Sequence, residues 1–424
     1  MTLSLTAVEQ ELLDGGRGPA IALAMRIVVA LADLRGAVRL RSVNSAHLDG
    51  CLFHGQAGLD FAERLVGLGG KVSVPTTVNV GSLDLLHPEY IRSPKAEKQQ
   101  ARRLMDAYAE LGARPTWTCA PYQVGHRPGV GEHVAWAESN AIVFCNSVLG
   151  ARTDRYGDFL DACAAITGLV PDAGLHLTEN RRATVILDCA SLSDALKASS
   201  VLYPVLGFIA GREAGTQIPV FTGLDPSHLD EDKLKSLGAT AASAGGVALF
   251  HVVGFTPEAA TLADALGGRS PRDVPTVVVD AAVVQTARNA LSTAKGVRLE
   301  AVSLGTPHFS LAEFKALAEL TVGKGPFDPS IEVWVSTSRA ILDQARDAGY
   351  VEPIERAGAK ILTDTCTYVT PVLKAASKTV MTNSGKWAYY APGNLGVDVV
   401  FGSLAECVTS ARNGKVVHDD TTWC

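Results

Sequence analysis

Short runs of β-forming residues alternate with helix-length stretches along most of the 424-residue chain, and this alternation limits the possible folds. Continuous apolar runs typical of strands buried on both faces occur at 71–74, 141–144, 183–187, 246–250, 275–279, 331–335 and 360–362. Helical patterns occur at 59–68, 95–111, 280–293 and 311–320, and residues 8–34 predict two helices divided at Gly15 and Gly16. The order predicts a multi-lobed α/β architecture with mostly parallel sheets flanked by helices.

The length of the chain predicts two or three lobes, since single domains seldom grow much beyond about 250 residues. Stretches rich in Pro and Gly near residues 170–180 and 211–223 are the expected divisions.

Composition excludes several classes of protein. The 38 Lys and Arg residues against 44 Asp and Glu form no basic stripe, so nucleic acid is not an expected partner. No apolar run approaches the roughly 18 residues of a membrane span, so no membrane association is expected. The N-terminus lacks the pattern of a signal peptide, and the eight cysteines are scattered without a CxxC pair. We therefore expect a cytoplasmic protein whose cysteines stay reduced.

Polar or cysteine-bearing segments follow three of these predicted strands and a further predicted strand at 299–303. They are residues 75–79, 145–147, 305–308 and 363–366. Because ligands bind beyond the carboxyl ends of strands in open α/β sheets, we expect these four segments to share one cleft.

Residues 45–55 bring His47, Asp49, Cys51 and His54 together beside two glycines. The segment is either a turn around one buried histidine or a loop that contacts substrate, because these spacings match no zinc pattern.

Cys119 and Cys366 are each either a buried structural cysteine or a metal ligand. Cys119 precedes a proline by two residues, which favours a loop, and Cys366 follows a predicted strand between hydroxyl side chains and Asp364.

Two further segments carry many hydrogen-bonding groups. Residues 136–153 include Ser139, Asn140, Asn146, Ser147 and Arg152, and the arginine is the natural partner of a carboxylate or of a surface acid. Residues 384–386 read Ser-Gly-Lys and could hold an anion, but the spaced glycines of a P-loop are absent.

The motifs, taken in order along nearly the whole chain, resemble the large subunit or large domain of the aconitase X family. The matching segments are Gly50, residues 74–79, 118–122, 138–140, 146–153, 305–308, 364–366 and 382–386. Members of that family are hydro-lyases related to aconitase, among them phosphomevalonate dehydratases and cis-3-hydroxy-L-proline dehydratases. The resemblance implies an aconitase-like fold, with iron or an iron-sulfur cluster between this large part and a smaller swivelling part.

Carried over by position, the resemblance implies that Cys119 and Cys366 are cluster ligands. The third family cysteine lies in a Gly-Cys-Pro-His motif, and this chain has Thr306 there, so the resemblance implies that the Thr306 hydroxyl is a weaker metal ligand beside the two thiolates. One thiolate fewer favours a smaller cluster such as [2Fe-2S], or mononuclear iron, with Cys145 as a substitute ligand. Thr306, a cysteine before Asn146 and the Val80 that follows Asn79 resemble the hydroxyproline branch more than the phosphomevalonate branch.

This branch implies dehydration of cis-3-hydroxy-L-proline to pyrroline-2-carboxylate, with iron as the Lewis acid. The expected substrate-binding residues are Gly50, His54, Asn79, Ser139, Asn140, Asn146, Ser147 and Arg152. The candidate catalytic residues in this chain are Cys51, Ser384 and Lys386, because the family's serine base belongs to the swivelling part. That small aconitase X part is expected as a separate chain, and a small carboxylate as the substrate.

Two alternatives stay open at this point. Arg152 and Lys386 would also serve the phosphate of a phosphomevalonate dehydratase, so charge does not distinguish the two substrates. The chain could also be a non-catalytic binding subunit whose loops persist without a cluster.

Overall fold

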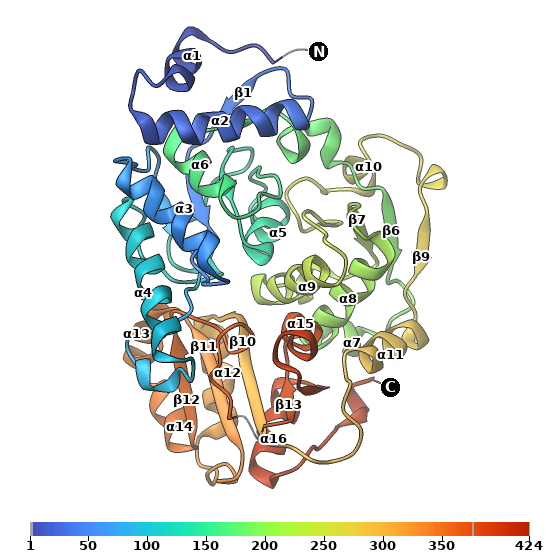
Figure 1. Cartoon of the computed structure of the whole chain (residues 1–424). Coiled ribbons are helices and arrows are strands. Elements are labelled where there is room, and N and C mark those ends of the chain that lie inside the picture. Colours follow the sequence, from blue (N-terminus) through green and yellow to red (C-terminus); the bar gives the residue numbers. More distant parts are fainter. Residues whose placement is uncertain (1–2, 375–376, 424) are drawn as a thin grey trace. The chain divides into compact units, whose positions relative to one another are not determined.

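The computed structural model describes residues 3–374 and 377–423 and shows an α/β protein with mostly parallel sheets, as the sequence predicts (Figure 1). It divides into two units. The first comprises the residues up to Leu83 together with Ser93–Arg182, and the second comprises Asp84–Arg92 together with the residues from Ala183 onward. The stretch at 211–223 lies inside the second unit and covers the end of α8, the following loop and all of β7.

The first unit holds a small parallel sheet of order β3-β2-β4 and an antiparallel pair, β1 with β5. Its strands are β1 (Leu40–Ser42), β2 (Ala46–Leu48), β3 (Thr76–Val78), β4 (Ala135–Trp136) and β5 (Leu169–Pro171). Its helices are α1 (Ala7–Asp14), α2 (Pro19–Leu34), α3 (Gln56–Gly67), α4 (Lys95–Glu110), α5 (Ser139–Ser147) and α6 (Leu160–Thr167). Helix α2 packs on α6, and α3 packs on α4.

The second unit holds two larger parallel sheets. The first has the order β8-β7-β6-β9, and the second has the order β12-β11-β10-β13-β14. The four strands of the first are β6 (Val185–Asp188), β7 (Pro219–Thr222), β8 (His251–Val252) and β9 (Thr276–Val278). The five strands of the second are β10 (Ala301–Phe309), β11 (Glu332–Thr337), β12 (Ala359–Thr363), β13 (Thr379–Thr382) and β14 (Asp398–Phe401).

Helices connect these parallel strands, as crossover connections require. With the four-stranded sheet go α7 (Asp194–Ala198), α8 (Leu202–Ala214), α9 (Glu231–Ala244), α10 (Leu262–Ala265) and α11 (Ala281–Ala290). With the five-stranded sheet go α12 (Leu311–Thr321), α13 (Arg339–Asp347), α14 (Val351–Arg356), α15 (Gly385–Leu395) and α16 (Leu404–Asn413). Helix α15 also packs on α8 and α9, so the two sheets of this unit share a helical layer (Figure 1).

Residues 84–92 belong to the second unit although the chain around them belongs to the first. The carboxylate of Asp84 accepts hydrogen bonds from the backbone N–H of Thr363 (2.9 Å) and of His87 (2.8 Å). At the other end of the segment, Arg92 Nε donates to the carbonyl of Val372 (2.8 Å). The segment is therefore fastened at both ends to the five-stranded sheet and its loops.

Three predicted strands are wrong. Residues 141–144 lie in helix α5, because Glu138 caps that helix by accepting from Ala141 N, and a four-residue apolar run fits a buried helix equally well. Residues 71–74 do not pair with one neighbouring strand. Val72 N donates to Leu111 O, and Ser73 N donates to Ala165 O in a different segment. Residues 246–250 start at a glycine with φ 97°, and the pairing with β7 begins only at His251.

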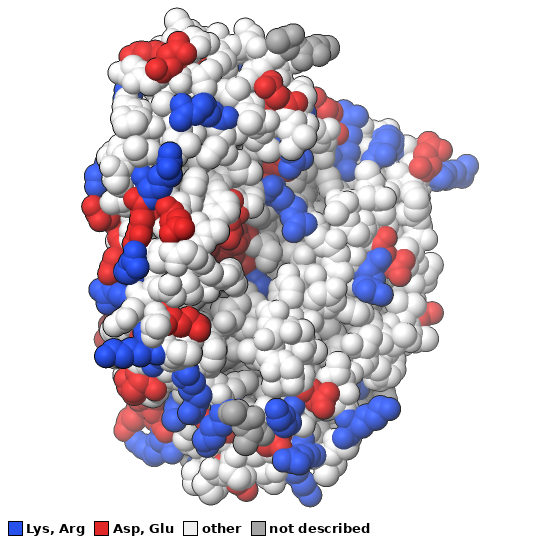
Figure 2. All heavy atoms as spheres, viewed as in Figure 1, with Lys and Arg blue, Asp and Glu red and all other residues white. Residues whose placement is uncertain are grey.

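None of the helices in the described ranges is long and apolar enough to cross a membrane. On the face that Figure 2 shows, Lys and Arg side chains are interspersed with Asp and Glu side chains.

Candidate functional site

Strand β10 carries Thr306 and His308 in a stretch where the regular pairing with β11 is interrupted, between Leu304 and Phe309. Every residue of β10 is buried. The Thr306 hydroxyl is buried with no hydrogen-bond partner among the described residues. Because buried polar groups are nearly always satisfied, this hydroxyl marks a place where a ligand would complete the contacts.

The imidazole of His308 is held in one tautomer. Its Nε2 lies 3.1 Å from the carbonyl oxygen of Thr365, and a carbonyl only accepts, so Nε2 carries the hydrogen and Nδ1 carries the lone pair. The pKa of His308 is lowered to about 4, mainly by burial. The hydrogen bond to Thr365 raises the pKa, and the nearby charges of Lys235 and Lys386 lower it. A neutral imidazole with a fixed tautomer is the form that binds a metal.

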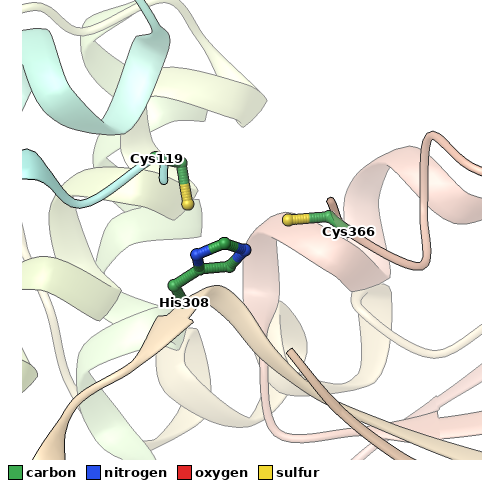
Figure 3. Close-up of side chains that lie close together, drawn as sticks. All are labelled: Cys119, His308 and Cys366. Carbon is green, nitrogen blue, oxygen red and sulfur yellow. The ribbon is translucent and has the colours of Figure 1, made fainter. Parts of the chain in front are cut away.

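Cys366 lies in the loop after β12, next to His308. Their ligand atoms lie within 4.8 Å of each other, and Figure 3 shows both side chains. The loop begins with Asp364, a non-glycine residue at φ 64° whose carboxylate accepts two hydrogen bonds from Arg339, at 2.8 and 2.6 Å. Such a strained backbone conformation persists only where surrounding contacts enforce it, so the Arg339 pair helps to hold the position of Cys366.

Cys119, the third residue drawn in Figure 3, belongs to the first unit and is 4% exposed. It precedes the short helix η2 (Pro121–Gln123), and its carbonyl accepts a hydrogen bond from Asn140 Nδ2 at 2.9 Å. Trp117, two residues earlier, has φ 44°. The loop around Cys119 is therefore held by α5 on one side and by a constrained backbone on the other.

Cys145 has a different environment from these two cysteines. It is fully buried in an apolar cluster of the first unit that includes Tyr122, Trp136 and Phe144. Burial raises the pKa of Cys145 far above its ordinary value, so the thiol stays protonated. Its role as a substitute ligand stays a prediction, and these surroundings favour a packing role.

The donor types fit iron. Thiolates with an imidazole suit iron and small iron-sulfur clusters, and the bond from His308 Nε2 to a backbone carbonyl is typical of a metal-bound histidine. His308 itself was not predicted from the sequence. The signal was present, because the motif that placed Thr306 ends in histidine, which is a common metal ligand.

Gly50, Cys51 and Asn79 come together in the first unit, at the carboxyl ends of β2 and β3. A Cβ on Gly50 would lie 2.3 Å from the Tyr108 hydroxyl, so only glycine fits there. Cys51 is fully buried, and its pKa is raised well above the usual range by burial and then by Asp161 and Asp49. Cys51 therefore stays a thiol. The predicted substrate residue His54, three residues on, is exposed.

The predicted residues on and after α5 mostly hold the first unit together. Asn146 exchanges hydrogen bonds with the backbone of Thr153 (2.9 and 3.0 Å), and its Oδ1 also accepts from Arg181 at 3.0 Å. Asn140 donates to Tyr122 as well as to Cys119 O, and its Oδ1 has no described partner. Its free acceptor makes Asn140 a better candidate for ligand contact than Asn146.

The remaining predicted residues of this group have neighbours of their own. Ser139 donates to Glu138 at 3.0 Å, and Ser147 is buried in α5. Arg152 donates to the carbonyl of His176 and to Thr178 Oγ1. Arg152 therefore braces the neighbouring loop in this structure, and its contact with a substrate carboxylate stays a prediction.

Ser384 and Lys386 lie at the start of α15. Ser384 caps the helix by accepting from Trp387 N at 3.0 Å, and its hydroxyl donates a short hydrogen bond to the carbonyl of Thr306. Lys386 is 2% exposed, and its ammonium lies 5.8 Å from the centre of the Tyr368 ring. Ser384 thus links α15 directly to the strand that carries His308.

Comparison with known proteins places these features in one family. Residues 2–179, 183–289 and 299–413 match the first, second and third domains of aconitase X. The chain is 43% identical over 421 residues to a cis-3-hydroxy-L-proline dehydratase of Pseudomonas aeruginosa, covering 99% of this chain and 72% of that protein. It is 38% identical over 400 residues to a phosphomevalonate dehydratase large subunit of Methanothermobacter thermautotrophicus, covering 94% of this chain and 96% of that one.

A solved structure agrees with the sequence comparisons. The crystal structure of Thermococcus kodakaraensis aconitase X, in a holo-form, matches with a TM-score of 0.86 and 34% identity over 96% of this chain and 100% of that one. The fold, the domain matches and the near full-length identity agree, and the chain belongs to the aconitase X family.

Proposed function

We propose that this chain is the large catalytic part of a hydro-lyase that dehydrates cis-3-hydroxy-L-proline to pyrroline-2-carboxylate. The observation that carries the proposal is the 43% identity over 99% of the chain to a dehydratase of that name. The relative that is named for phosphomevalonate is less similar, at 38%. The neutral His308 beside Cys366 adds support, since dehydratases of this kind need a bound Lewis acid.

In this proposal Cys119, His308 and Cys366 are the ligands of iron or of a small iron-sulfur cluster such as [2Fe-2S]. Two thiolates and one imidazole are donor types that suit such a centre, and each of the three side chains is buried. When bound, the metal would supply the Lewis acid that weakens the bond to the leaving hydroxyl. The buried Thr306 hydroxyl, two residues from His308, is suited to bind a polar group of the substrate.

The residues of the chain would share the proton transfers. Dehydration breaks the C2–H bond, with the proton taken by a base, and the C3–O bond, with the oxygen leaving as water after gaining a proton. The enamine that forms then tautomerises to pyrroline-2-carboxylate. Because Cys51 stays protonated, it fits a proton donor better than a base. Ser384 and Lys386 stay candidates in this chain, together with a base on the small part.

The partner in this proposal is a small aconitase X chain. The support is that 96% of a relative named a large subunit is covered by this chain. The compartment in this proposal is the reducing cytoplasm, where thiolates remain able to bind metal.

The test is an activity assay of the chain co-expressed with a small aconitase X chain and purified without oxygen. We expect pyrroline-2-carboxylate from cis-3-hydroxy-L-proline, no reaction of phosphomevalonate, and iron in the protein. Thr306→Cys should raise the iron-sulfur content and lower the dehydration rate, because an added thiolate changes the metal's charge and crowds the substrate.

Other outcomes would decide against the proposal. Preference for phosphomevalonate would assign the chain to the other branch, and unchanged metal content and activity in Thr306→Cys would refute Thr306 as the residue that separates the branches. A complex that holds no iron and acts on neither substrate would indicate a binding subunit.

A further inference from the structure

Three polar side chains stand in a row at one edge of the small sheet of the first unit. Asp49, Asn79 and Glu138 follow the ends of β2, β3 and β4, and all three strands are parallel. The pairing of Leu48 with Val78 and of His47 with Trp136 sets Asn79 and Glu138 on either side of Asp49. The carboxyl edge of a parallel sheet is where ligands of α/β proteins bind.

The contacts of Asn79 leave an acceptor without a donor. Its Nδ2 donates a short hydrogen bond to Asp49 Oδ1, which places the amide in the row, and the residue is 2% exposed. Its Oδ1 is buried and has no partner among the described residues. A buried acceptor without a hydrogen bond costs about 1–3 kcal/mol of stability. We therefore expect a ligand to donate a hydrogen bond to Asn79 Oδ1.

Asp49, which is partly buried, differs from the fully buried Asp161 beside it. The carboxylate of Asp161 holds backbone, accepting from Asp49 N at 2.6 Å and from Ala162 N at 2.7 Å. The carboxyl of Asp49 accepts one described hydrogen bond, the one from Asn79. Asp161 therefore stabilises the local backbone, whereas a carboxyl oxygen of Asp49 can accept a hydrogen bond from a ligand.

The charges around Asp49 favour a positively charged ligand. Burial raises the pKa of Asp49 well above its ordinary value, and the carboxyl groups of Glu138, Asp158 and Asp161 raise it further. Carboxyl groups gathered in this way repel phosphate and carboxylate, and a cation would relieve their mutual repulsion. The missing group is therefore a cation that can donate hydrogen bonds.

We propose that Asp49 and Asn79 form the subsite for the secondary ammonium group of a cyclic amino-acid substrate. Such an ammonium has two N–H groups, and the subsite offers two acceptors, the Asp49 carboxylate and Asn79 Oδ1. This inference rests on the proposed function and adds to it a reason for substrate choice. A phosphorylated substrate without an amine would gain nothing here, so Asp49 becomes a residue that determines specificity.

The first test is Asp49→Asn in the complete iron-loaded complex, with Asp60→Asn as the matched control. Asp60 is an exposed carboxylate on α3 in the same unit, bonded to Gln56. We expect Asp49→Asn to raise KM for cis-3-hydroxy-L-proline by about 10- to 100-fold with a smaller change in kcat, as for loss of a charged hydrogen bond. Iron content and thermal unfolding should stay unchanged, because asparagine has nearly the shape of a protonated aspartic acid. The control should change KM less than about twofold.

The second test measures binding without turnover, by calorimetry with L-proline and with (S)-tetrahydrofuran-2-carboxylate, in which oxygen replaces the ring nitrogen. The wild type should bind L-proline at least about 10-fold more tightly, and both Asp49→Asn and Asn79→Ala should lose most of that preference. Equal binding of the two ligands by the wild type, binding of neither, or a preference that survives in Asp49→Asn would overturn the ammonium subsite.

The two tests separate the inference from the proposed function. If the wild type fails to dehydrate hydroxyproline but still selects L-proline through Asp49, the reaction is wrong and the ammonium subsite stands. If the wild type dehydrates hydroxyproline and Asp49→Asn leaves KM unchanged, the reaction stands and the subsite is wrong.

Discussion

At the scale of single residues, Cys366 can be tested against a cysteine that only packs. We expect Cys366→Ser to remove most of the bound iron and the activity with little change in unfolding, because the serine hydroxyl is a poor ligand for iron. Cys407→Ser in α16 is the matched control, since Cys407 is also fully buried. The control should keep its iron and lose roughly 1–3 kcal/mol of stability, through a buried hydroxyl without a partner. Iron analysis and chemical unfolding measure both, and the reverse pattern would make Cys366 a packing residue.

A second residue-scale prediction concerns two histidines of the first unit. The Nδ1 atoms of His133 and His176 lie 2.9 Å apart, so one must donate to the other, and His176 Nε2 also bonds to the Tyr156 hydroxyl at 2.5 Å. Burial is the main cause that lowers the pKa of His133 to about 4 and of His176 to about 3. In the unfolded chain these histidines bind protons near pH 6.5. The contribution of the neutral pair to the unfolding free energy is therefore fully present above about pH 6.5 and is lost as the pH falls toward 4.

We expect the wild type to lose about 1–2 kcal/mol of unfolding free energy over that range from this pair, after allowance for the solvent exposure of His133. Chemical denaturation at pH 7.5, 6, 5 and 4 measures the loss. The double variant His133→Gln with His176→Gln should show a flatter pH dependence, and His54→Gln, which changes an exposed histidine, should match the wild type. Parallel curves for the wild type and the double variant would contradict the prediction.

At the scale of elements, the start of α15 combines a helix cap with a candidate catalytic group. Ser384→Ala removes both the cap on Trp387 N and the bond to Thr306 O, and Ser403→Ala removes a comparable cap at the start of α16. Each should cost about 1–2 kcal/mol of stability. If Ser384 transfers a proton, only Ser384→Ala should also lower kcat, by about 100-fold or more. Equal kcat values in the two variants would leave Ser384 as a cap alone.

At the scale of the whole molecule, the fold should not depend on the metal. Both units have extensive apolar cores of their own, and a chain of this length buries enough surface to fold without a metal. Chelation of iron should therefore abolish activity, leave the far-ultraviolet circular dichroism unchanged and lower the unfolding midpoint by a few degrees at most, about 2–4 °C per kcal/mol of lost binding energy. Cooperative unfolding on chelation would show instead that the metal is structural.

The long periodic helices and the buried parallel strands could be predicted from the sequence because their signals are local. Helices α3, α4, α11 and α12 occur where the apolar period predicts them, as do β6, β9, β11 and β12. The short apolar run at 141–144 failed because four buried residues do not distinguish a strand from a helix, and the cap by Glu138 decides the matter. A short apolar run thus indicates a buried segment, and contacts outside the run decide whether that segment is a strand or a helix.

By itself, the sequence determined the α/β class, the family and the cysteines to be considered as ligands, since composition, period and motif are properties of the chain in one dimension. Only the tertiary structure showed that His308 carries its hydrogen on Nε2, that Cys145 lies in an apolar core, and that Asp49 and Asn79 stand side by side. The physical reason is strand pairing. Residues 30 apart, such as Asp49 and Asn79, become neighbours through the register of β2 with β3, and hydrogen bonds between distant segments then fix each tautomer and each charge.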